Sequence, residues 1–279
     1  MNYRSPWLRI FQLLPAVFLV MGCNLQKDID VELPTGPTQL VAECYLENGI
    51  IPRLTVTETM PYLSATELTT LPDVTVVLTL PNGTHDTLQY APGQDRRTRK
   101  AYTHISKRRL LARPGDKFRL DITDKGGLGR HLTGTATMPT TVSIDTVEWK
   151  FNDKPEDERQ AYVIARFQDP GNSTDFYRFQ IHKSRINQDP ESDYNVDDRL
   201  NNGQLITLGT SYQFNPSDTV IVTVYHIDEP YYRFMESVEN ARGANGNPFA
   251  QPAAISSTVE GGLGVFTVLN YQRKQVLIK

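Results

Sequence analysis

Residues 73–83 read DVTVVLTLPNG, and this stretch sets the expected fold class. Apolar residues at every second position give it the period of a β-strand with one buried face: Val74, Val76, Leu78 and Leu80. The sequence Pro81-Asn82-Gly83 then supplies the residue types of a turn. The stretch therefore predicts a strand that ends in a turn.

The same pattern recurs along the chain. Residues 117–124 place Phe118, Leu120 and Ile122 on one face, and residues 217–228 form a long strand whose alternating face continues to His226. Residues 161–168 and 176–183 read as a pair of strands joined through Asp169-Pro170-Gly171. Closely spaced short strands with Gly, Pro, Asn and Asp between them indicate a sandwich or a barrel.

One segment, residues 229–243, has helical spacing instead. Asp228 is a candidate N-cap, and Pro230 is tolerated in a first turn because its missing N–H would be unpaired there. Gly243 is a candidate end. An apolar stripe at i, i+3, i+4 and i+7 predicts a face that packs on the core: Tyr231, Phe234, Met235 and Val238.

A Thr-rich stretch after Met138-Pro139 precedes a new strand pattern near Ile144, which indicates a boundary. We therefore expect a mainly β protein. It has an N-terminal immunoglobulin-like β-sandwich over residues 35–140, followed by a β-rich C-terminal domain over residues 141–279 with one amphipathic helix.

The N-terminus has the layout of a secretory signal over residues 1–22, with a basic start, a short apolar run and a small residue at its end. Residues 20–23, Val-Met-Gly-Cys, resemble the bacterial lipobox, which would make Cys23 the lipidated first residue of the mature protein. The alternative is an ordinary cysteine behind a signal peptide. Residues 23–34 would then form a lipid-anchored tether.

Charged residues begin four positions after the cysteine. Lys27, Asp28 and Asp30 resemble the tag that sends lipoproteins to the cell surface in Bacteroidetes-type bacteria. The alternative is a solvated tether without an address. We expect an outer-membrane protein that is lipid-anchored and faces the cell exterior.

The composition argues against only one class of partner, nucleic acid. The formal net charge is −3, and it becomes −5 once Arg4 and Arg9 leave with the signal, so no electrostatic argument favours a nucleic-acid partner. With Cys23 lipidated, Cys44 is the sole remaining cysteine and no internal disulfide forms. Its strand-like surroundings predict a small buried side chain.

Catalytic and metal motifs are lacking, so we expect no enzyme, no cofactor and no metal. The five histidines are scattered without the i, i+4 spacing of a helical zinc site, and no nucleophile elbow or phosphate loop occurs. The acidic stretch 189–198 alternates like a calcium loop, but Tyr194 and Leu200 stand where an EF-hand needs glycine and glutamate. A looser calcium site stays open there beside a solvated acidic loop.

A second charged stretch of the chain is basic rather than acidic. Eight cations occur between residues 96 and 113 with no acid among them: Arg96, Arg97, Arg99, Lys100, Lys107, Arg108, Arg109 and Arg113. They form either a basic hairpin on a solvated face or a contact for an anionic partner.

Three Asp-Thr-apolar triplets resemble O-glycosylation sites of exported Bacteroidetes proteins, at Thr87, Thr146 and Thr219.

The C-terminal stretch carries the most specific pattern, with these positions: Asn247, Pro248, Phe249, Glu260, Gly261, Gly262 and Gly264. Together with the lipobox, residues 28–46 and the Tyr-rich helix, it resembles the Bacteroidetes lipoprotein family catalogued as domain of unknown function 4249. The likeness spans nearly the whole mature chain. Physically, the glycines are expected to shape turns or a bulge and Phe249 to fill the core.

The resemblance implies an outer-membrane lipoprotein of a kind often encoded near TonB-dependent transporters, with no catalytic residues to carry over. We expect a surface-exposed lipoprotein that binds a ligand or acts as an accessory partner of such a transporter. The alternative is a structural or adhesive cell-envelope lipoprotein without a transport role.

Overall fold

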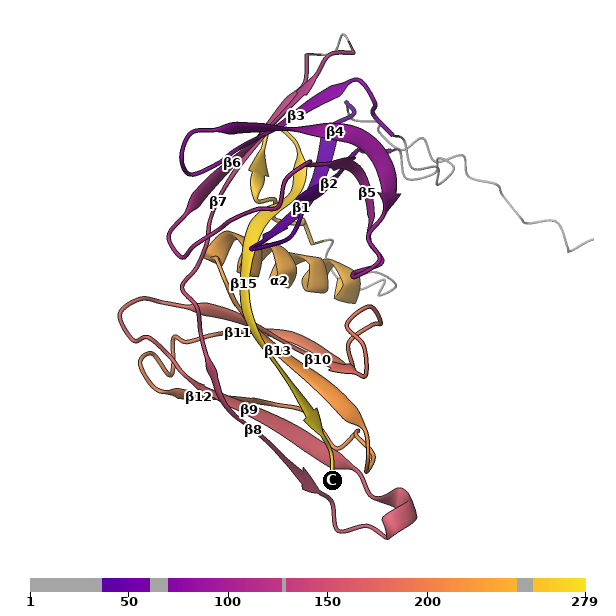
Figure 1. The fold of residues 1–279 in the computed structure, drawn as a ribbon, viewed down its shortest axis with the longest axis vertical. Helices are drawn as coiled ribbons and strands as arrows, with labels where there is room; N and C mark the ends of the chain where they lie inside the picture. Colours follow the sequence, from indigo (N-terminus) through magenta and orange to yellow (C-terminus); the bar gives the residue numbers. More distant parts are fainter. Residues whose placement is uncertain (1–36, 61–69, 127–128, 245–252) are drawn as a thin grey trace, which may run out of the picture. The chain divides into compact units, whose positions relative to one another are not determined.

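The structure is a computed structural model that describes residues 37–60, 70–126, 129–244 and 253–279. Two β-sheets make up most of it (Figure 1). A mixed sheet of 12 strands has the order β11-β10-β13-β15-β1-β2-β5-β4-β3-β6-β7-β14, and a sheet of three has the order β12-β9-β8. The strands are β1 (Leu40–Glu47), β2 (Arg53–Glu58), β3 (Val74–Thr79), β4 (His85–Gln94), β5 (Ala101–Ile105), β6 (Lys117–Asp124), β7 (His131–Thr137), β8 (Ile144–Phe151), β9 (Ala161–Gln168), β10 (Phe176–Lys183), β11 (Ser192–Asp197), β12 (Leu205–Gly209), β13 (Thr219–Ile227), β14 (Val259–Glu260) and β15 (Leu263–Leu277).

The strands predicted from alternating apolar residues are confirmed. In β3 and β6 every second side chain is buried, and the buried face of β13 runs from Val220 to His226. The predicted pair 161–168 and 176–183 is not a hairpin, however. β9 lies in the three-stranded sheet, whereas β10 pairs with β11 and β13 in the large sheet. The connection at Asp169 to Asp175 therefore crosses from one sheet to the other.

The last strand, β15, joins two groups of strands (Figure 1). Its first half pairs in parallel with β1, from Val41 opposite Leu263 to Glu47 opposite Leu269. Its second half pairs antiparallel with β13, from His226 opposite Asn270 to Thr219 opposite Leu277. β15 thus pairs with β1, which lies more than 200 residues earlier in the chain, and with β13, which lies about 50 residues earlier.

Two large hydrophobic cores lie beside these groups. The first draws its side chains from β1, β2, β3, β6 and β7, and it also contains Val259 and Phe266 near the C-terminus. The second lies among β8, β9, β10, β12 and β13 and includes Ile278. The contacts of residues 38–279 do not divide near residue 140. The immunoglobulin-like sandwich and the two-domain organisation remain predictions.

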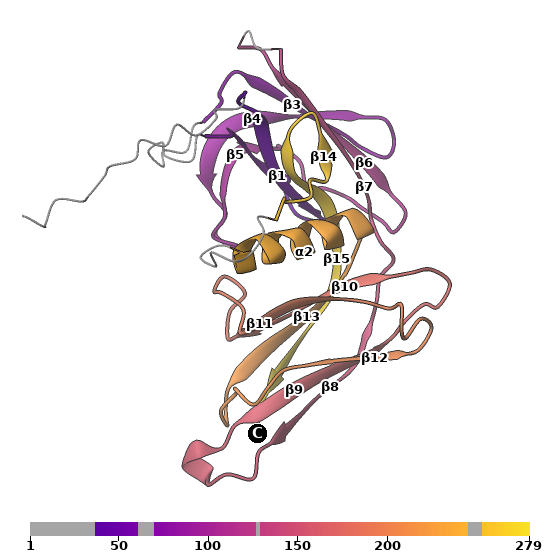
Figure 2. The same cartoon turned by 180° about the vertical axis from the view of Figure 1, so that it is seen from behind.

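The predicted helix is confirmed as α2 (Glu229–Ala244), which ends one residue later than expected. The Asp228 carboxylate accepts a hydrogen bond from the Tyr231 backbone N–H at 3.0 Å, as an N-cap does. Tyr231 and Tyr232 are buried in a third cluster with Val265 and other residues, so the apolar stripe packs beside β15 (Figure 2). Among the described residues, no helix has the length and apolar character needed to span a membrane.

Candidate functional site

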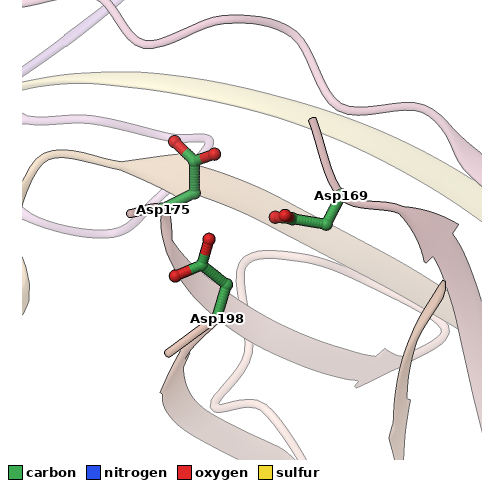
Figure 3. Close-up of side chains that lie close together, drawn as sticks. All are labelled: Asp169, Asp175 and Asp198. Carbon is green, nitrogen blue, oxygen red and sulfur yellow. The ribbon is translucent and has the colours of Figure 1, made fainter. Parts of the chain in front are cut away.

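Three buried aspartates meet where β9, β10 and β11 begin or end (Figure 3). Asp169 directly follows β9, Asp175 directly precedes β10, and Asp198 directly follows β11. One carboxylate oxygen of each lies within 4.8 Å of the others. Their exposed fractions are 2%, 7% and 0%, respectively. The fold therefore gathers three carboxylates from two connections into a space closed to solvent.

Asp169 is held by hydrogen bonds from both connections. Its Oδ2 accepts from the backbone N–H of Gly171 at 3.2 Å and of Gly203 at 2.7 Å, and its Oδ1 accepts from the Tyr177 hydroxyl at 2.5 Å. Gly171 has a φ of +73°, and a Cβ placed there would lie 2.6 Å from the Gly203 Cα. Glycine is thus required where the two connections approach backbone to backbone.

Asp175 faces His226 of β13. Its two carboxylate oxygens accept from the Ser173 hydroxyl at 3.1 Å each, and one lies 3.1 Å from His226 Nε2. On the other side of the ring, His226 Nδ1 lies 2.8 Å from the Thr140 carbonyl oxygen and 3.2 Å from the Thr140 hydroxyl oxygen. The imidazole ring therefore bridges Thr140 and Asp175, which fixes the orientation of the Asp175 carboxylate.

Asp198 has no such partner. Its side chain is fully buried, and within the described part of the chain neither carboxylate oxygen makes a hydrogen bond. Burial raises the pKa of this carboxyl above its ordinary value. Its backbone is fixed by an N–H bond to the Asp175 carbonyl at 3.1 Å and by a bond from the Asn201 N–H at 2.7 Å. The backbone therefore holds an unpaired carboxylate inside the cluster.

The cluster carries an excess of negative charge. Three carboxylates converge there, and the one basic side chain among the described residues that contacts them is His226, which faces Asp175. Among the described side chains, no lysine or arginine forms an ion pair with any of the three aspartates. Buried charges without a partner are costly, so they are normally protonated, paired or bound to a metal ion.

The sequence did not predict this cluster, because only residues 189–200 were compared with a single calcium loop and a looser calcium site was left open within that one stretch. In the structure Asp193 instead forms an ion pair with Arg178 at 2.6 Å, and Asp189 is exposed. Of that acidic stretch only Asp198 reaches the cluster. The signal that could have found it is the stretch 169–175, DPGNSTD, in which two aspartates flank a glycine turn.

A second feature is a small surface recess between β1 and the turn that joins β4 to β5. Arg97 pairs with Glu47 at 2.5 Å, and Lys100 pairs with Glu43 at 2.5 Å. The Lys100 ammonium also lies 4.2 Å from the centre of the Tyr45 ring. The recess is thus lined by paired charges and tyrosine together with aliphatic side chains such as Ile50 and Leu54, so it presents both polar and apolar atoms.

Residues from elsewhere in the chain compensate part of the basic segment. Its cations lack acids in the sequence, but β1 supplies two carboxylates in space, and Arg109 donates to the Gly49 carbonyl at 2.9 Å. Six of the eight cations are exposed and form no ion pair with a described carboxylate: Arg96, Arg99, Lys107, Arg108, Arg109 and Arg113. Contact between this segment and an anionic partner stays a prediction.

Comparison with known proteins assigns the chain to a family. A family model described as Domain of unknown function (DUF4249) matches residues 26–275. The chain belongs to the DUF4249 family. No curated protein matches it. The DUF4249 match confirms the resemblance seen in the sequence, and it covers both sites described above.

In this DUF4249 chain the C-terminal glycines are structural. Gly261 has a φ of +76° and Gly264 a φ of +124°, conformations that side chains rarely adopt. A Cβ at these two positions would overlap the carbonyl oxygens of His131 and Ala42, respectively. Gly261 thus lets the turn before β15 fit against β7, and Gly264 lets the start of β15 fit against β1. Three motif positions, Asn247, Pro248 and Phe249, lie outside the described residues.

The remaining predicted positions fall in different places. Cys23 and the candidate export tag Lys27, Asp28 and Asp30 lie outside the described residues. Of the candidate O-glycosylation sites, Thr87 and Thr146 are exposed, whereas Thr219 is half-buried on β13. Cys44 is buried in β1, as predicted, and burial raises the pKa of its thiol to about 12.

Proposed function

We propose that the protein is an outer-membrane lipoprotein that faces the cell exterior and acts as a ligand-binding or accessory partner of a TonB-dependent transporter. The observation that carries the proposal is the position of the DUF4249 domain. The match begins at residue 26, three residues after Cys23, and extends to residue 275. The domain therefore begins directly behind the candidate lipidation site, and it accounts for almost all of the chain beyond it.

Lipidation at Cys23 supplies the anchor in this proposal. Burying acyl chains contributes about 0.8 kcal/mol per CH₂ group, so two or more chains hold a folded domain stably on a membrane. The glycine before Cys23 and the apolar run before that glycine support cleavage at this point. The tag-like residues Lys27, Asp28 and Asp30 support export to the outer face.

Cys23→Ser is expected to remove the protein from the outer membrane. Without the thiol no acyl chain can be attached, so the chain should appear in the soluble periplasmic fraction or as an uncleaved precursor. Fractionation with metabolic labelling by a fatty acid measures this. Cys44→Ala is the matched control, because Cys44 is buried in β1 and should leave fractionation unchanged. A labelled Cys23→Ser protein in the outer membrane would disprove the anchor.

The exposed part of the basic segment is the proposed contact for an anionic patch on a partner. Replacing Arg96, Arg99, Lys107 and Arg108 with glutamine should change stability by no more than about 0.5 kcal/mol per site, because these side chains point into solvent. The fourfold variant should recover less of the partner than the wild type does. Recovery of the partner by the wild type should fall when salt is added. Thermal melting and capture at low and high salt measure the two effects.

Arg97→Gln is the contrasting control for that experiment. It leaves Glu47, which is 8% exposed, without its cation and should destabilise the fold by about 1–2 kcal/mol. Unchanged partner recovery in the fourfold variant at both salt concentrations would remove the basic segment from the interface.

A further inference from the structure

We propose that Asp169, Asp175 and Asp198 together bind one divalent cation of the calcium type. Ligand oxygens of Ca²⁺ lie about 2.3–2.6 Å from the ion, so two ligands of one ion are at most about 5 Å apart. One oxygen of each of the three aspartates satisfies this limit, since they lie within 4.8 Å of one another. The spacing of the carboxylates therefore fits a shared ion.

The unpaired Asp198 carboxylate is the independent reason to place an ion there. A fully buried carboxylate oxygen without a hydrogen bond is rare in native structures, and Asp198 has two among the described contacts. Asp169 and Asp175, by contrast, each accept hydrogen bonds that fix their orientation. A cation in the cluster would give the Asp198 carboxylate the partner it lacks.

The cluster offers negative charge to a cation. Three carboxylates converge there, and among the described side chains no lysine or arginine forms an ion pair with any of them. A divalent cation compensates more of this charge than a monovalent ion does.

The ligand chemistry favours calcium over the other common divalent ions. All three groups offer carboxylate oxygen, which hard cations prefer, and His226 Nε2 is engaged with Asp175 rather than free for zinc. Mg²⁺ keeps several water ligands in octahedral geometry, but these side chains are nearly closed to solvent. Ca²⁺ accepts irregular sets of protein oxygens and fits a closed site of this kind.

Binding would tie the two sheets together. Asp169 directly follows β9 of the three-stranded sheet, and Asp175 and Asp198 adjoin β10 and β11 of the large sheet. The ion would therefore link the strands on either side of the second core. Because the site is formed only in the folded chain, calcium should stabilise the protein by mass action.

Calcium titration of the chelator-treated, full-length protein in detergent tests the proposal. Calorimetry should show one calcium ion per chain, and calcium at about 100 times its dissociation constant should raise the melting temperature by about 5 °C or more. Mg²⁺ at the same concentration should have a smaller effect. Absence of binding heat and of a melting shift with calcium would overturn the proposal, and an equal or larger Mg²⁺ shift would overturn the calcium assignment.

Asp198→Asn and Asp189→Asn form a matched pair of variants. Asp198→Asn should abolish the calcium shift, and without calcium it should melt at or above the wild-type temperature, because it removes a buried unpaired charge. Asp189→Asn changes an exposed residue of the same acidic stretch and should keep the full shift. A full calcium shift in Asp198→Asn would also overturn the proposal. If that variant does not fold, the wild-type titration decides alone.

Discussion

Gly264→Ala is expected to destabilise the protein by more than about 3 kcal/mol and to reduce the yield of folded protein. Gly264 has a φ of +124°, and an added Cβ would overlap the Ala42 carbonyl oxygen in β1. Neither backbone can move freely, because Ala42 and Gly264 are opposite each other in the parallel pairing of β1 with β15. Backbone strain and the loss of this pairing both lower the free energy of unfolding. Because that free energy is only about 5–15 kcal/mol for a whole domain, a loss of this size should reduce the yield of folded protein.

Denaturant unfolding of the variant measures this effect, and Gly243→Ala is the control. Gly243 lies in α2, and apart from the helix itself no atom of the described residues comes within 4 Å of an added Cβ, so alanine should stabilise the protein by up to about 1 kcal/mol. A Gly264→Ala protein within about 1 kcal/mol of the wild type would show that β15 does not sit against β1 as described.

Phe266→Ala is expected to cost about 3–5 kcal/mol, the range for removing a buried aromatic side chain. Phe266 is 1% exposed in the first core, and it packs so closely on Gly134 of β7 that a Cβ there would lie 3.1 Å away. Because β15 also pairs with β13 beside the second core, the loss should lower the stability of both halves together.

Urea unfolding followed by fluorescence and circular dichroism tests this coupling. The two signals should give one coincident transition that is shifted to lower urea concentration in Phe266→Ala. Leu263→Ala, at a 41% exposed position of the same strand, should shift the transition only slightly. Two separate transitions, with only one moved by Phe266→Ala, would contradict a fold in which β15 couples the two cores.

The local structure could be predicted from the sequence because local chemistry determines it. Alternation of Val74, Val76 and Leu78 indicated a strand with one buried face, and the Asp228 cap with the spacing behind it indicated the helix. The partners of each strand could not be predicted in the same way. Nothing in the alternation of residues 263–269 says that they pair in parallel with β1, which lies more than 200 residues earlier.

The candidate metal site was missed for the same reason. Asp169, Asp175 and Asp198 meet because the connection after β9 changes sheet, and a search within one short stretch cannot detect that. The ion pairs of the basic segment could not be predicted either, because Glu43 and Glu47 approach it from a distant strand. In both cases the residue types were visible in the sequence, and the three-dimensional neighbours were not.

Affinity capture tests the proposed role most directly. A tag placed after Lys279 would extend from an exposed C-terminal residue, and the tagged protein can be recovered from detergent-solubilised outer membranes for mass spectrometry. The proposed function predicts that a TonB-dependent transporter is enriched with the wild type and reduced with the variant that lacks Arg96, Arg99, Lys107 and Arg108. Recovery of the anchored protein with other envelope components and no transporter would contradict it and favour the structural or adhesive alternative.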